Sequence, residues 1–210
     1  LPLYFHTDAC QASAWLDLHA HRLGVDMMTI NAGKIYGPKQ CGALFIKTGI
    51  LLKPQILGGG QERGLRSGTE NVANIVGFAK ALQLVQSRRH QEVKRMRGLQ
   101  KAFMSELTQC IPSSKINGSV SHRLPNNVHL TIPGQDNERL AMILDEMGIQ
   151  CALGSACSAS SEEPSHVLTA IGLTKAGAQS SLRFTMGSST SLGDVGTVVK
   201  ALAKIIRMGV

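Results

Sequence analysis

Two charged side chains near the start of this 210-residue sequence lie where they can do chemistry. Asp8 ends an apolar stretch, and the ligands of an α/β sheet collect at the carboxyl ends of its strands. A carboxylate there can pair with the protonated ring nitrogen of a cofactor. Lys34 stands between a buried stretch and the turn Gly37-Pro38, where desolvation lowers the pKa of an amine and makes it nucleophilic. Taken singly, each has a simpler interpretation, a turn cap and a solvated lysine.

A thiol is the third chemical feature. Cys157 lies in the segment GSACSASS (154–161), whose remaining residues are all glycine, serine or alanine. A loop of such small residues leaves a sulfur accessible. It is the strongest candidate for a nucleophile in the chain. A buried cysteine otherwise behaves as a small apolar residue, and we expect that role for Cys41 and Cys110. Cys10 and Cys151 lie in strand-like contexts, where we also expect packing roles.

The elements that must position Asp8 and Lys34 are short apolar strands. Three apolar stretches separated by turn-rich segments are typical of buried strands in an α/β sheet, at 3–9, 27–31 and 43–47. After a polar loop opened by Gly58-Gly59-Gly60, apolar residues recur at three- and four-residue spacing. This spacing predicts a long helix that begins near residue 70, with Ser67 or Thr69 as its N-cap.

A second domain is expected from about residue 90. The polar segment 87–100 continues the long helix, and its basic residues predict a solvated helix face. Further elements are predicted as a strand, a helix, a strand and a helix with one apolar stripe, at 128–132, 137–147, 181–185 and 192–206. The pattern therefore predicts a sheet domain over 1–90 and a small α+β domain over 91–210.

Composition excludes several classes of protein. The net charge is +8, but aromatic residues are only 4% and no nucleic-acid-reading motif is present, so direct nucleic-acid binding is not expected. The five cysteines form neither a CxxC pair nor a disulfide framework, which favours a reducing compartment. No run approaches the roughly 20 apolar residues that cross a bilayer, and no leader is visible. We expect a cytoplasmic protein, with a mitochondrial or other organellar location left open.

Four motifs occur together in one order: HTDACQ, then IYGPK directly after Lys34, then GGGQERGLRSGTEN and GSACSAS. In this order and spacing they resemble the NifS/IscS type of cysteine desulfurases, which belong to the class-V aminotransferases. The resemblance runs from His6 to Gly187. It implies the α/β fold of the aspartate-aminotransferase-like, pyridoxal-phosphate-dependent transferases. Residues 1–90 would be the C-terminal part of the large cofactor-binding domain and the start of the connecting helix, and 91–210 the small C-terminal domain that carries the cysteine loop.

The resemblance assigns roles to individual residues. Asp8 would pair with the pyridine nitrogen of pyridoxal 5'-phosphate, and Gln11 would hydrogen-bond its phenolic oxygen. Lys34 would bind the cofactor covalently and then move a proton at the substrate α-carbon. Thr69 would reach the cofactor phosphate of the partner subunit, at a helix N-terminus that favours anions. Arg183 would bind the substrate carboxylate, for which a planar guanidinium is well suited.

The activity implied is the conversion of L-cysteine to L-alanine. Cys157 would take the substrate sulfur as a persulfide and pass it to an iron-sulfur scaffold protein or a sulfur carrier. The enzyme would work as a homodimer, without a metal and without a membrane. The loop form GSACSAS resembles the subgroup that delivers sulfur directly to several acceptors.

The sequence departs from the family in two ways. Asn31 and Gly33 stand where a serine and a histidine usually help to hold the cofactor phosphate. Asn31 can still donate a hydrogen bond, so we expect altered cofactor affinity and not a lost function. The family also carries an N-terminal portion comparable in size to this chain, so we expect a piece of something longer that binds the cofactor poorly by itself. Three alternatives stay open: a selenocysteine lyase, a related lyase such as a cystathionine lyase, and a truncated non-catalytic paralogue.

Overall fold

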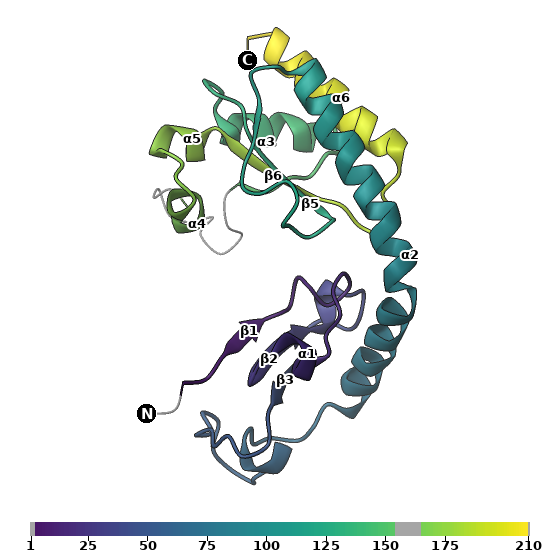
Figure 1. Ribbon diagram of the computed structural model, residues 1–210, viewed down its shortest axis with the longest axis vertical. Helices are drawn as coiled ribbons and strands as arrows, with labels where there is room; N and C mark the ends of the chain where they lie inside the picture. The colour runs from purple at the N-terminus through teal and green to yellow at the C-terminus, as the bar shows by residue number, and fades with distance from the viewer. Residues whose placement is uncertain (1–2, 154–164, 210) are drawn as a thin grey trace. The chain divides into compact units, whose positions relative to one another are not determined.

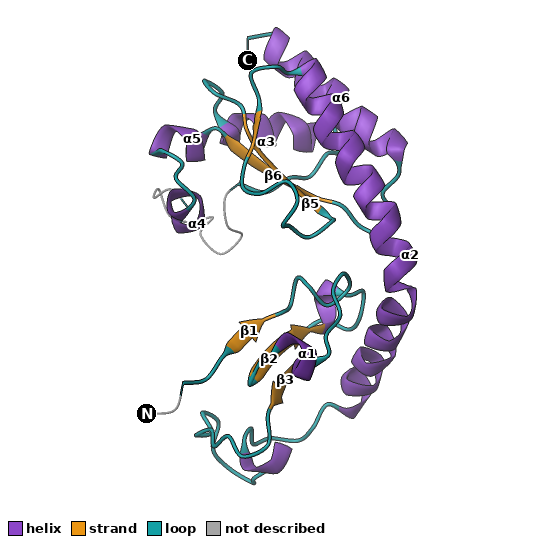
Figure 2. Ribbon diagram, in the orientation of Figure 1, coloured by secondary structure: helices purple, strands orange, loops and turns teal. Residues whose placement is uncertain are grey.

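The computed structural model describes residues 3–153 and 165–209. The chain forms two compact units, Leu1–Gln91 and Glu92–Val210, and the boundary falls inside one long helix (Figure 1). Both units contain helices as well as strands (Figure 2). That these units are the two domains implied by the family resemblance stays a prediction. Within the two described ranges, no helix is long and apolar enough to cross a membrane.

The first unit is built on a three-stranded sheet in the order β1-β2-β3. β1 (His6–Asp8) is parallel to β2 (Met27–Asn31), and β3 (Gly42–Ile46) is antiparallel to β2. The second and third strands are confirmed to within one residue. The first is shorter than predicted, because its pairing with β2 begins only at His6. Three single-turn helices complete the unit: α1 (Ala20–Leu23), η1 (Ala32–Lys34) and η2 (Glu62–Gly64).

Helix α2 (Val72–Cys110) begins in the first unit and ends in the second. Its predicted start near residue 70 is confirmed, but its predicted N-cap is wrong. The Asn71 side chain accepts a hydrogen bond from the backbone N–H of Asn74 (3.3 Å), the position that an N-cap satisfies. Ser67 is used within the preceding loop instead, where its hydroxyl accepts from the N–H of Gly60 (3.2 Å).

The second unit is an antiparallel sheet covered by helices. Its strands are β4 (Lys115–Ile116), β5 (Asn127–Thr131) and β6 (Ser181–Thr185), in the order β4-β5-β6. Its helices, besides the second half of α2, are α3 (Asn137–Glu146), α4 (His166–Ala170), α5 (Lys175–Gln179) and α6 (Leu192–Arg207). The two strands and two helices predicted here are confirmed to within one residue at each end.

The core of the second unit joins α2 to the sheet. The rings of Phe103 in α2 and Phe184 in β6 meet edge to face, with their centroids 5.5 Å apart. The apolar stripe predicted for α6 is confirmed, because Val195, Val199 and Leu202 are buried. That helix starts with a capping box of Ser191 and Asp194, which satisfies the orphan N–H groups of its first turn.

Two predictions about α2 are wrong. Cys110 is exposed, although Leu107, one turn earlier, is buried, because Cys110 is the last residue of the helix, where the buried face ends. The basic stretch is not simply a solvated face either. Arg95 and Arg97 are half-buried, and their guanidinium groups donate to backbone carbonyls of the second unit, Arg95 to Thr190 O (2.7 Å) and Arg97 to Arg123 O (2.7 Å).

Candidate active site

Asp8 and Lys34 follow neighbouring parallel strands. Asp8 is the last residue of β1 and pairs in register with Thr29 of β2. Lys34 ends η1, the helical turn that begins directly after Asn31, the last residue of β2. Because the carboxyl ends of parallel strands lie at the same edge of a sheet, the topology brings both groups to one edge of the first unit (Figure 1). Both side chains are exposed, so the desolvated environment predicted for the Lys34 amine is not found among the described residues.

Hydrogen bonds hold Asp8 in its ionised form. Its carboxylate accepts from the backbone N–H of Cys10 (2.9 Å), and the Cys10 side chain together with this bond holds the pKa of Asp8 below its usual value. Burial, together with the Asp8 charge, raises the pKa of the Cys10 thiol to about 11. The Cys10 thiol is therefore uncharged at physiological pH, and it donates to the carbonyl of Thr29 (3.9 Å). Cys10 lies in the turn after β1, not within the strand. His6 Nε2 lies 2.8 Å from Thr29 Oγ1 and ties β1 to β2 two residues before the carboxylate.

The remaining residues predicted for this edge lie at or just after the ends of the same two strands. Gln11 is exposed in the turn after β1, and Asn31 is half-buried at the end of β2. A Cβ atom added at Gly33 would lie 3.2 Å from Asn31 Oδ1, so the two positions at which this sequence departs from the family pattern are in contact. A side chain at position 33 would press on the Asn31 amide. Glycine at 33 and asparagine at 31 therefore fit one another.

The first half of α2 holds both turns in place. Gln86 donates from Nε2 to the carbonyls of Ser13 (2.7 Å) and Leu16 (2.9 Å), which fixes the segment that follows β1. Gly77 lies directly against Pro38, in the turn after Lys34: a Cβ atom at position 77 would come within 2.7 Å of Pro38 Cγ. Neither Gly77 nor Gln86 was singled out from the sequence, because helical periodicity shows only which residues share a face.

Thr69 follows a loop whose residues are held together by hydrogen bonds within the loop. Gln61 Oε1 accepts from the N–H of Gly68 (3.0 Å), and the N–H of Ser67 donates to Ile56 O (3.2 Å). Gly58, Gly60, Gly64 and Gly68 all have positive φ, which glycine adopts without strain. Thr69 itself is exposed, three residues before α2 begins.

Arg183 lies in the second unit, on β6. It pairs across the sheet with His129 of β5, and it also forms a two-residue bridge with Ala152. Its side chain lines a pocket of about 280 Å³, together with Arg123 and residues of α4. The Nε atom of Arg183 is buried and has no hydrogen-bond partner in the part of the chain that the structure describes. A buried donor without an acceptor is uncommon in native proteins.

Cys157, the predicted nucleophile, lies outside the described residues. Cys151, just before that segment, is half-buried in a loop. Burial, with a contribution from Asp145, raises the pKa of the Cys151 thiol to about 11. Cys151 is therefore a poor nucleophile, and the packing role predicted for it is consistent with its burial.

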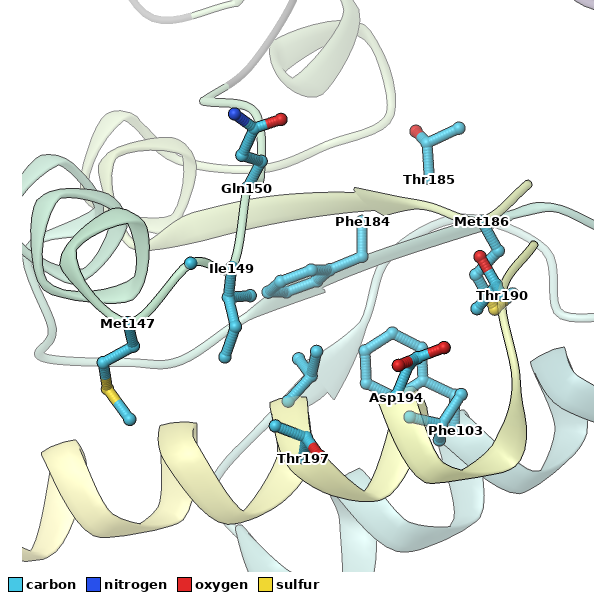
Figure 3. A pocket seen from close by; sticks show the side chains of 13 residues that line it. Phe103, Met147, Ile149, Gln150, Phe184, Thr185, Met186, Thr190, Asp194 and Thr197 are labelled. Atoms are coloured by element: carbon cyan, nitrogen blue, oxygen red, sulfur yellow. The ribbon is translucent and has the colours of Figure 1, made fainter. Parts of the chain in front are cut away.

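A second hollow in this unit, of about 330 Å³, contains none of the predicted site residues. Figure 3 shows that its wall mixes apolar side chains, among them Ile149, Phe184 and Phe103, with polar ones such as Thr190 and Thr197. Its carboxylate, Asp194, already accepts from the N–H and the hydroxyl of Ser191 (2.8 Å each). We therefore do not include this hollow in the candidate active site.

Comparison with known proteins gives consistent matches over almost the whole chain. A family model described as aminotransferase class-V matches residues 2–198. The cysteine desulfurase IscS of Dictyoglomus turgidum is 42% identical over 204 residues, which cover 97% of this chain and 52% of that protein. The cysteine desulfurase IscS of Clostridium botulinum is 42% identical over 207 residues, covering 98% and 52%. The chain thus spans about half the length of the curated relatives it matches.

The chain is also similar to solved structures of NifS-like proteins. A NifS-like protein from Rickettsia africae superposes with a TM-score of 0.89 at 30% sequence identity, covering 97% of this chain and 54% of that one. Another NifS-like protein superposes with a TM-score of 0.86 at 30% identity, covering 97% of this chain and 52% of that one.

Proposed function

This chain belongs to the class-V aminotransferase family, and on that premise we propose that it forms part of a cysteine desulfurase, the part that carries the cofactor lysine and the nucleophilic cysteine. The family match and the NifS-like structures confirm the predicted α/β fold of the pyridoxal-phosphate-dependent transferases. The observation that carries the proposal is the placement of Asp8 and Lys34 after neighbouring parallel strands. The relatives named cysteine desulfurase support the reaction class, and the reaction we propose converts L-cysteine to L-alanine with the sulfur passed to the enzyme.

Enzymes of this family use pyridoxal 5'-phosphate, and the donors in the first unit suit that group. The ionised carboxylate of Asp8 suits a protonated ring nitrogen, and the amide of Gln11 offers a donor to a phenolic oxygen. Lys34 offers the primary amine that an aldehyde requires. Thr69 and Asn31 offer a hydroxyl and an amide to a phosphate. When bound, the cofactor withdraws electrons from the substrate α-carbon.

The chain's own residues would carry the remaining steps. Lys34 takes and returns the proton at the substrate α-carbon, and Arg183 binds the substrate carboxylate. The Cys157 thiolate attacks the substrate sulfur, so that an S–S bond forms as the C–S bond of the substrate breaks. The electron pair of the broken bond is then protonated at carbon to give L-alanine. The sulfur stays on Cys157 as a persulfide.

The partners and the setting are part of the same proposal. The acceptor of the persulfide sulfur would be an iron-sulfur scaffold protein or a sulfur carrier, and the enzyme would be a cytoplasmic homodimer in which Thr69 serves the cofactor of the partner subunit. The names of the IscS relatives support the sulfur-transfer role. The dimer is supported by the family resemblance alone, and sedimentation of the cofactor-loaded protein tests it.

The decisive experiment is a search for sulfur on Cys157. The longer protein, which joins this chain to the N-terminal portion that the family carries, is incubated with pyridoxal 5'-phosphate and L-cysteine, and its intact mass and its peptides are then measured. We expect one additional sulfur atom on Cys157, lost in Lys34→Ala and kept in Lys39→Ala, a lysine of the same segment. Sulfur on Cys110 instead, or sulfur that persists in Lys34→Ala, would contradict the proposed mechanism.

A further inference from the structure

The pocket beside Arg183 is lined by two arginines and by no acidic side chain among the described residues. Besides Arg183 it is bordered by Arg123, His129 and the apolar side chains of Val167 and Leu168 in α4. Two cations facing one small pocket of about 280 Å³ repel one another unless an anion lies between them.

Arg123 is fixed in position and keeps one free donor. Its Nε donates to the carbonyl of Ser119 (2.7 Å), and its Nη2 donates to the carbonyl of Asn117. Its Nη1 is buried and finds no hydrogen-bond partner among the described residues. The same is true of Arg183 Nε. Native proteins seldom leave buried donors unsatisfied. Both arginines that line this pocket therefore keep a donor for which the described residues supply no acceptor.

His129 adds a neutral donor to the same pocket. The Asn117 amide nitrogen, 2.8 Å away, can only donate, so His129 Nδ1 accepts and the ring proton is on Nε2. The orientation of that amide is set by Thr131, whose hydroxyl donates to Asn117 Oδ1 (3.0 Å). Burial, and then the charges of Arg183 and Arg123, lower the pKa of His129 to about 4. The ring is therefore uncharged at physiological pH, and no third cation faces the pocket from its described lining.

From this arrangement we infer that Arg123 and Arg183 form a two-arginine site for a small carboxylate, and that Arg123 is a second contact of the substrate carboxylate beside Arg183. Two guanidinium groups with free N–H donors can hold the two oxygens of one carboxylate from two directions. The apolar wall formed by α4 leaves room for a short carbon chain. The identification of the anion as the substrate carboxylate rests on the proposed function, whereas the binding of a carboxylate does not.

A direct binding measurement on the whole chain, without cofactor, tests the site. The probe is propionate, and its neutral isostere propionamide is the control. Binding is followed by NMR through the ring protons of His129. Propionate is expected to shift these signals and to raise the pKa of His129, because the bound anion offsets the two arginine charges. Propionamide is expected to leave them unchanged, and an equal response to the two compounds would overturn the inference.

Two variants that each remove one positive charge test whether Arg123 binds the carboxylate. Arg123→Gln is expected to weaken propionate binding by about tenfold or more, since it removes a charged donor. Arg139→Gln removes the same charge from an exposed position on α3 and is expected to bind propionate as the unaltered chain does. Propionate binding that is equal in Arg123→Gln and Arg139→Gln would overturn the role of Arg123.

A third variant keeps the test informative if Arg123→Gln fails to fold, because Arg123 also braces two backbone carbonyls. Val167→Glu places a carboxylate at the rim of the pocket, at a side chain that is half exposed, and leaves those hydrogen bonds intact. It is expected to abolish propionate binding, and binding that survives it would overturn the inference. None of these measurements involves Cys157 or the cofactor, so a failure of the desulfurase proposal would be seen separately, in the persulfide experiment.

Discussion

Gly77 of α2 lies against Pro38, so closely that a Cβ atom at position 77 would stand 2.7 Å from Pro38 Cγ. On the other side of the same contact, Gly37 faces Ala81, and a Cβ atom at 37 would be 3.1 Å from Ala81 Cβ. The helix thus presses on the turn that follows Lys34. The position of Lys34 therefore depends on the absence of a side chain at position 77 of the helix.

Gly77→Ala is accordingly expected to destabilise the first unit, although alanine is the better helix former. The added methyl group overlaps a rigid proline ring, and overpacking of this kind costs about 1–3 kcal/mol. Unfolding in urea, followed by the fluorescence of Trp15, the single tryptophan and a buried residue of this unit, measures the effect.

Gly98→Ala is the matched control in the same helix. A Cβ atom at position 98 would meet nothing within 4 Å, and the position is exposed. Only the helix propensity changes there, so the substitution should stabilise the second unit, to which Gly98 belongs, by about 0.5–1 kcal/mol, measured in urea by circular dichroism. If Gly77→Ala and Gly98→Ala changed the free energy of unfolding in the same direction, the contact between α2 and the Pro38 turn would be refuted.

Gln86→Ala tests the other anchor. The substitution removes two hydrogen bonds, to the carbonyls of Ser13 and Leu16, and leaves those acceptors without their partner. The expected loss is about 1–3 kcal/mol, again measured through Trp15 fluorescence. Gln83→Ala, at an exposed position one turn earlier where the side chain bonds to Lys80, should change the stability by no more than about 0.5 kcal/mol. Equal effects at 83 and 86 would contradict the anchoring role.

The main elements could be predicted because each has a local signature. β6 at 181–185 and the apolar stripe of α6 follow directly from periodicity. Local signals also account for two errors. Asn71, not Ser67 or Thr69, caps α2, and all three residue types are good caps, so only the hydrogen bonds of the loop decide among them. The burial predicted for Cys110 rests on the usual burial of cysteine, although this one ends a helix.

The residues that surround Arg183 could not be predicted, because strand pairing brings them together. His129 and Arg183 are 54 positions apart and become neighbours only through the register of β5 and β6. Arg123 joins them through bonds to Ser119 and to Asn117, which follows β4. Asp8, in contrast, ends its own strand, so its position at the sheet edge is visible in the sequence. The hydrogen bond from the backbone N–H of Cys10 to Asp8 is not, because the sequence indicates only packing at Cys10.

Asp8→Asn is expected to lower the turnover of L-cysteine by the cofactor-loaded protein about a hundredfold or more, since it removes an ionised group aimed at a developing charge. The amine of Lys34 remains, so the cofactor should still be trapped on this lysine by borohydride reduction. Asp145→Asn, at an exposed position of α3, is the control and should turn over normally. Unchanged turnover in Asp8→Asn would remove this carboxylate from the mechanism.

His129 gives the second unit a dependence on pH with a definite sign. The pKa of its ring is about 4 in the folded chain, against a usual value of 6.5. The unfolded chain therefore takes up the proton first as the pH falls. The stability contributed by the neutral ring is complete above pH 6.5 and is lost as the pH falls from 6.5 towards 4, with up to about 2 kcal/mol lost by pH 5.

His129→Gln should remove this loss, because glutamine has no proton to bind in this range. The free energy of unfolding, measured in urea by circular dichroism at pH 7 and pH 5, should fall between the two values in the unaltered chain and change much less in the variant. His122→Gln, an exposed histidine of the same unit, should keep the full dependence. The carboxylates with lowered pKa values, such as Asp8 and Glu92, contribute to all three proteins alike and mainly at still lower pH. An identical loss in His129→Gln and His122→Gln would show that the ring of His129 is not held neutral by its burial and the two arginines.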